Sequence, residues 1–152
     1  MRNVRRGFFV ITLCVLAAAT VNNAEESNPH IPITSITPRP GAVISRDTVL
    51  KVVLSYSIDQ AKVGVELYAI HPLFDSTEPG HSFNALKRFK DGVLVKQPAG
   101  TIEFEYAIAG EWDQGGLAKP VVVTFCLMKR EAKGSSVSIA EAEPVTYQVA
   151  SK

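Results

Sequence analysis

Apolar and polar residues alternate along most of the chain after residue 30, in short runs that turn-forming residues separate. The clearest run covers residues 49–58 and places five apolar side chains on one face: Leu50, Val52, Leu54, Tyr56 and Ile58. A period of two is typical of β-strands that bury one face. No helical period of useful length accompanies it. The pattern therefore predicts an all-β chain.

Other runs of the same kind bring the total to about seven strands, at residues 31–36, 62–69, 92–98, 101–108, 120–130 and 144–149. In the run 62–69, the alternation predicts that Val63, Val65 and Leu67 face inward and that Tyr68 faces outward. Strands of this number and length, with turn signals between them, are typical of two antiparallel sheets packed face to face. The longest irregular stretch, residues 71–91, is predicted to be a loop.

The first 24 residues predict a signal peptide. Arg2, Arg5 and Arg6 precede an apolar run that is short for a membrane span, and small residues follow it. Cleavage after Ala24 leaves a short tail at residues 25–30 and one domain at residues 31–150. An uncleaved membrane anchor is the alternative. The expected location is secreted or periplasmic, without stable membrane insertion after the signal is removed.

Removal of the signal changes the charge and the cysteine content. Three of the 16 Lys and Arg residues lie in the signal and none of the 15 Asp and Glu residues does, so the remaining chain carries a net charge near −2. This balance gives no basic surface for nucleic acid. Cys126 is then the sole cysteine, which excludes an internal disulfide. If Val123 and Phe125 face inward, Cys126 lies on the other face of its strand, but the continuous apolar run leaves this phase open. We expect an unreactive, partly covered thiol.

The order of these segments resembles the bacterial immunoglobulin-like and fibronectin type III-like modules. The segments are "ITPRPGAVI", "VLKVVLSYSI", "KVGVELYAI", "AGTIEFEYAI" and a closing "AEAEPVTYQV", and the resemblance covers roughly Ile31 to Val149. The resemblance implies an immunoglobulin-like β-sandwich and a module that binds or spaces rather than catalyses. The chain departs from antibody-type domains, because the paired cysteines are missing and Trp112 lies outside the strands.

Aromatic and acidic residues supply a candidate binding surface. The segment "GEWDQGG" offers Trp112 and Asp113 between glycines, where an indole ring can stack on a sugar or anchor a partner protein. Alternatively, Trp112 folds back and closes the end of the sandwich. Tyr68 is a further candidate, on the outer face of its strand or beneath the long loop.

A second constellation lies in the predicted loop, where His71, Asp75, Glu78 and His81 offer ligands that zinc or copper accepts. Their spacing matches no specific metal signature, and the prolines and glycine of "HPLFDSTEPGH" explain the stretch equally well as a turn-rich connection. No serine motif, paired acids or phosphate loop predicts catalysis.

We therefore expect a non-enzymatic module that needs no cofactor and binds an envelope or extracellular protein or a polysaccharide through loops and edge strands. The alternative is a small periplasmic protein that binds zinc or copper through the segment 71–81.

Overall fold

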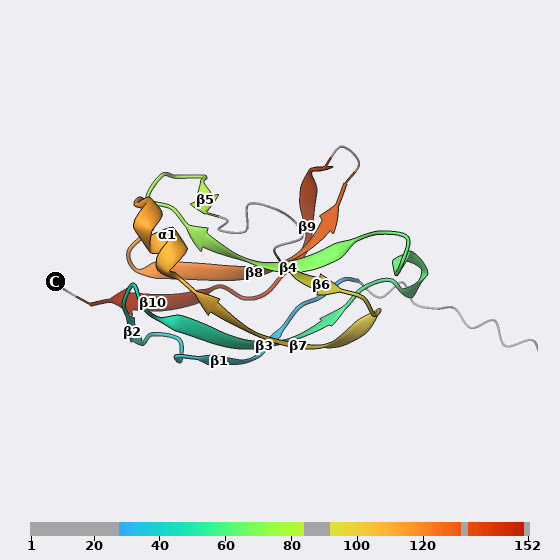
Figure 1. Ribbon diagram of the computed structural model, residues 1–152, viewed down its shortest axis with the longest axis horizontal. Coiled ribbons are helices and arrows are strands. Elements are labelled where there is room, and N and C mark those ends of the chain that lie inside the picture. The colour runs from blue at the N-terminus through green and yellow to red at the C-terminus, as the bar shows by residue number, and fades with distance from the viewer. Residues whose placement is uncertain (1–27, 84–91, 132–133, 151–152) are drawn as a thin grey trace, which may run out of the picture.

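Two β-sheets packed face to face make up the protein in the computed structural model, which describes residues 28–83, 92–131 and 134–150 (Figure 1). The predicted all-β sandwich is confirmed. The predicted signal peptide lies outside the described residues. Within the described ranges, no helix has both the length and the apolarity to cross a membrane.

The smaller sheet has the order β1-β3-β7 and is antiparallel. Its strands are β1 (Ile33–Thr37), β3 (Val49–Ser57) and β7 (Ala99–Ala107). β3 and β7 pair residue by residue over their whole length, from Val49 opposite Ala107 to Ser57 opposite Ala99. β1 is an edge strand flanked by Pro32 and Pro38, and its register with β3 shifts between Ile33 and Ser35.

The larger sheet has the order β2-β10-β8-β4-β5, and β6 and β9 add to β4 and β8. The strands are β2 (Val43–Ile44), β4 (Tyr68–Asp75), β5 (Ser82–Phe83), β6 (Val93–Val95), β8 (Val121–Arg130), β9 (Ser136–Glu141) and β10 (Val145–Val149). Among the described strands, β2 and β10 alone pair in parallel. The antiparallel arrangement is therefore correct except where β2 meets the last strand.

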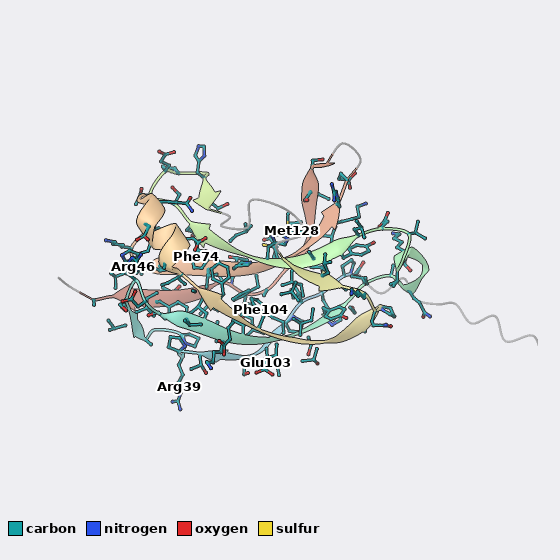
Figure 2. The ribbon with its side chains drawn as sticks, viewed as in Figure 1. Arg39, Arg46, Phe74, Glu103, Phe104 and Met128 are labelled. Atoms are coloured by element: carbon teal, nitrogen blue, oxygen red, sulfur yellow. The ribbon has the colours of Figure 1, made fainter. Side chains whose placement is uncertain are left out.

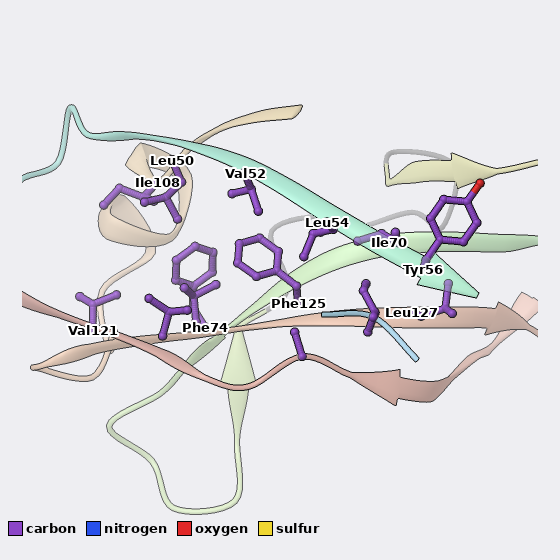
Figure 3. Packing of buried hydrophobic residues seen from close by; sticks show 14 of the residues in the cluster. Leu50, Val52, Leu54, Tyr56, Ile70, Phe74, Ile108, Val121, Phe125 and Leu127 are labelled. Carbon is purple, nitrogen blue, oxygen red and sulfur yellow. The ribbon is translucent and has the colours of Figure 1, made fainter. Parts of the chain in front are cut away.

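The core lies between the sheets and is built from the apolar faces of their central strands (Figure 3). Phe104 from the smaller sheet meets Phe125 edge to face, with ring centroids 5.9 Å apart. Phe74 and Phe104 point between the sheets, whereas Arg39 and Glu103 project outward (Figure 2). The predicted inward faces of 49–58 and 121–127 are confirmed, because their alternate apolar side chains are buried.

The predicted strand at 62–69 is wrong in both bounds and phase. Residues Gln60–Lys62 form a 3-10 helix, and Gly64 adopts a positive φ of 82°, which interrupts an extended chain. Val65 is 84% exposed and Leu67 55% exposed. The strand begins only at Tyr68, which is buried and faces inward rather than outward. The alternation of apolar residues alone did not show that the inward-facing positions begin at Tyr68.

β4 also extends into the predicted loop and carries a proline at position 72. The backbone N–H of Arg130 donates to the carbonyl of Leu67, just before β4 begins its pairing with β8. Because such bonds recur at every second residue of an antiparallel pair, the odd-numbered β4 residues bond to β8 and the even-numbered ones point to the other edge. On that edge, β6 pairs with residues 68–70 and β5 with residues 74–75. Pro72 therefore lies in the gap between them, where its missing N–H costs no ladder bond.

Cys126 lies on the outer face of β8, opposite Val123 and Phe125, and is fully buried. Burial, together with the nearby negative charge of Glu141, raises the pKa of the Cys126 thiol to about 11. The thiol is therefore protonated at neutral pH and poorly nucleophilic.

We expect Cys126 to resist a thiol-specific chromogenic reagent at pH 7.5 in the native protein and to react completely in denaturant. Cys14→Ser makes Cys126 the sole thiol for this measurement. Rapid stoichiometric labelling of the native variant would show that the thiol is exposed or activated.

Candidate functional site at the helical end of the sandwich

A single helical turn, α1 (Ala109–Gln114), connects β7 to β8 at one end of the sandwich. Ile108 is fully buried and anchors its start, and Gly115 and Gly116, both at φ 71°, end it. Successive helical residues point about 100° apart, so three consecutive side chains enter three environments. Glu111 is buried, Trp112 is half-buried and Asp113 is exposed.

Trp112 packs against the core and also lines an open hollow of about 420 Å³ with Thr77, Gly115, Gly116, Leu117 and Lys119. The Lys119 ammonium lies 5.9 Å from the centroid of the indole ring, which is within the range of a cation–π contact. The ring thus packs at the end of the sandwich while part of it stays accessible.

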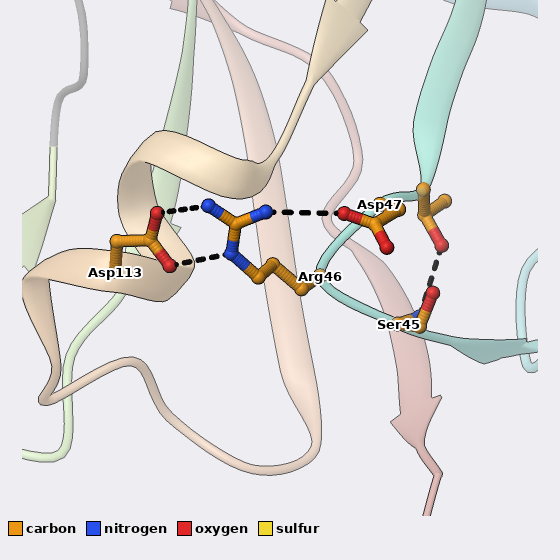
Figure 4. Close-up of polar contacts among 5 residues, drawn as sticks. Ser45, Arg46, Asp47 and Asp113 are labelled. Carbon is orange, nitrogen blue, oxygen red and sulfur yellow. Dashed lines mark hydrogen bonds and ion pairs between the residues drawn. The ribbon is translucent and has the colours of Figure 1, made fainter.

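Asp113 is held by a forked contact with Arg46 in the turn before β3 (Figure 4). Arg46 donates from Nε to Oδ1 at 2.7 Å and from Nη2 to Oδ2 at 2.6 Å, and it also donates to Asp47. These bonds lower the pKa of Asp113 below its ordinary value. Both partners are about half exposed, so the pair orients α1 more than it stabilises the fold.

Glu111 is a buried acid that the sequence did not single out. The Tyr106 hydroxyl donates to Oε1 at 2.7 Å, while Oε2 is buried and has no hydrogen-bond partner among the described residues. Burial raises the pKa of Glu111 above its ordinary value, against the effect of the Tyr106 hydrogen bond. A helix of one turn is too short to show a hydrophobic period, so no signal marked which of its side chains faces the core.

Only part of the predicted metal constellation comes together. Glu78 and His81 line another open hollow of about 420 Å³ beside α1, and the backbone N–H of His81 donates to the carbonyl of Glu78. Asp75, opposite Ser82 at the end of β4, lies near them. In the described part of the chain, no group of three or more His, Cys, Asp or Glu side chains has the geometry to hold a metal ion.

His71 lies in β4 rather than in a loop, which corrects the sequence-based assignment. It is four residues from Asp75, which is about 13 Å along a strand. Its ring is buried on the outer face of the sheet, and a Cβ added to Gly92 would come within 2.3 Å of Nε2. Gly92 therefore allows the backbone to pass directly over the imidazole.

Tyr68 does not contribute an exposed ring to a surface. It is 3% exposed, its hydroxyl donates to Glu66, and burial followed by this contact raises its pKa. Glu66 in turn lies 3.7 Å from the Lys129 ammonium. The structure therefore places Tyr68 far along β4 from α1 and joins it to a polar cluster of its own.

Comparison of the chain with protein-family models, with curated proteins and with solved structures finds no match. The fold and the geometry of the α1 end are therefore the grounds on which a function is proposed.

Proposed function

We propose that this chain is an exported, non-enzymatic interaction module of the cell envelope or extracellular space, which binds a protein partner or a polysaccharide at its α1 end. The order β1-β3-β7, facing a sheet that contains β6-β4-β8-β10, is similar to that of immunoglobulin-like and fibronectin type III-like modules. The expected signal peptide supports export.

The observation that carries the proposal is the half-buried indole of Trp112 at the wall of an open hollow. A ring fixed by core packing loses little conformational entropy on binding, so its accessible face contributes most of its contact energy. The Arg46–Asp113 pair holds the helical turn that carries it.

The lining of this hollow favours binding over chemistry. Thr77 supplies a hydroxyl whose hydrogen is donated to the carbonyl of Gly116 at 3.1 Å, and Lys119 supplies a cation over the indole ring. A nucleophilic mechanism requires a base beside the nucleophile. An aromatic face beside an ammonium instead suits a polar or acidic group of a partner.

We expect Trp112→Ala to weaken binding of the natural partner about tenfold or more, which corresponds to about 1.4 kcal/mol. The purified chain is immobilised, solubilised envelope and secreted material is passed over it, and the retained species is identified and titrated. Its sensitivity to protease or to periodate distinguishes a protein from a glycan.

Trp112→Phe keeps an aromatic face and should retain most of the affinity. Val65→Ala, at an exposed position on a different loop, should retain all of it. Equal retention by the wild type and Trp112→Ala, with both folded, would contradict the proposal.

A further inference from the structure

The edge of β7 that faces away from β3 is open: among the described residues, β3 is the sole strand that pairs with β7. β7 is nine residues long, contains no proline and shows no register shift against β3. The other edge of this sheet is different. β1 has a register shift after Ile33 and is flanked by Pro32 and Pro38, which are features that discourage a further strand.

The hydrogen-bonding phase of β7 follows from its two ends. The N–H of Ile58 donates to Pro98 at 2.7 Å, and the N–H of Ile108 donates to Thr48 at 3.3 Å. In an antiparallel pair these bonds recur at every second residue, so the even-numbered positions bond to β3. The N–H and C=O groups of Thr101, Glu103 and Glu105 therefore point to the open edge, at the spacing that an added strand requires.

The inward-facing side chains of β7 are also incompletely covered. Ile102, Phe104 and Tyr106 face the core but are only partly buried, whereas their neighbours on β3 are completely buried: Leu50, Val52 and Leu54. A strand added beside β7 would cover the inward side chains with its own apolar residues. Alternate residues of that strand would lie on the outer face, next to Glu103 and Glu105.

The outer face of β7 is acidic. Glu103 and Glu105 are exposed, and Glu105 also pairs with the Lys51 ammonium of β3, directly opposite, at 2.7 Å. An antiparallel pairing with a second copy of β7 would bring these carboxylates together, which is unfavourable. Charge complementarity instead selects a strand that carries lysine or arginine at its outward positions.

We propose that the open edge of β7 binds, by strand addition, an extended segment of another protein in which apolar residues alternate with lysine or arginine. Backbone hydrogen bonds to Thr101, Glu103 and Glu105 provide the register. The half-buried inward residues provide the apolar contact, and the two glutamates select the charge. This surface is separate from the α1 hollow, so either proposal can fail without the other.

The test uses the isotope-labelled chain and the synthetic peptide acetyl-Lys-Val-Lys-Val-Lys-Val-Lys-amide, with a peptide of the same length in which glutamate replaces lysine. We expect the lysine peptide to perturb the amide resonances of β7 and to slow the hydrogen exchange of Thr101, Glu103 and Glu105 at least tenfold. The glutamate peptide should bind at least tenfold more weakly.

Glu103→Pro removes one outward N–H and leaves the bonds to β3 intact, so it should abolish strand addition, whereas Glu103→Ala should weaken it only in part. Should Glu103→Pro fail to fold, the double variant Glu103→Lys/Glu105→Lys replaces it and should reverse the preference between the two peptides.

Several results would overturn the proposal: no binding at millimolar peptide, equal binding of both peptides, or self-association through β7. Perturbations centred instead on the open hollow of about 730 Å³ that Ile33, Ile36 and Pro144 line beside β1 would overturn it as well. Loss of this binding in Trp112→Ala would also contradict a separate surface.

Discussion

Replacing Phe125 with alanine is expected to lower the free energy of unfolding by about 3–5 kcal/mol, the range for removing a buried aromatic ring from a core. Phe125 is completely buried between the sheets and meets the ring of Phe104 edge to face, 5.9 Å from centroid to centroid. Domains of this size have a total stability of about 5–15 kcal/mol, so the loss is a large fraction of the whole.

Urea unfolding, followed by the fluorescence of Trp112, measures this change. Val65→Ala is the control, because Val65 is 84% exposed and its truncation should alter the free energy of unfolding by less than about 0.5 kcal/mol. A cost below about 1 kcal/mol for Phe125→Ala would mean that the two sheets do not pack around this ring.

The buried carboxyl of Glu111 should make the stability of the protein depend on pH. Burial raises the pKa of Glu111 in the folded state above its ordinary value of 4.5, so the unfolded chain releases this proton first. Its favourable contribution is complete below pH 4.5, declines as the pH rises from there, and is lost once the pH passes the folded-state pKa. Ionisation of Glu111 thus opposes folding near neutral pH.

Glu111→Gln keeps the shape of the side chain and an acceptor for the Tyr106 hydroxyl but cannot ionise. The variant should match the wild type near pH 4 and exceed it at pH 7 by about 1–3 kcal/mol, the range for relieving a buried polar group without a partner. Urea unfolding at a series of pH values measures the difference.

Glu143→Gln, at an exposed position, should follow the wild-type pH profile. If Glu111→Gln is less stable than the wild type at pH 7, the ionised carboxylate has a stabilising partner and its burial does not oppose folding.

The sequence predicted most of the sandwich where one face of a strand is buried and the other is wet. In β3 the alternation of Leu50 and Lys51 reports burial directly, because a shift of one residue would place every apolar side chain in water. The near-continuous apolar run of residues 120–130 is typical of a central strand, and β8 lies between β10 and β4.

The errors arose where tertiary context decides the structure. Val65 and Leu67 continue an alternating pattern, yet Gly64 and the preceding 3-10 helix turn the chain there. Pro72 argued for a loop, and only the gap between β5 and β6 makes it compatible with β4. At the candidate site, Trp112 and Asp113 were identified by residue type. The burial of Glu111 could not be predicted, because it depends on how α1 packs against the core.

The parallel pairing of β2 with β10 affects how the protein responds to a mechanical load. The described chain starts beside Ser57 at one end of the sandwich and leaves past Val149 at the other (Figure 1). A pull between the termini draws β2 backward and β10 forward along their common direction. It therefore shears together the hydrogen bonds from Gly41 to Thr146, from Gln148 to Ala42 and from Ala150 to Ile44. Bonds loaded in parallel share the force, so this short strand pair is expected to resist such a pull better than bonds that break one after another.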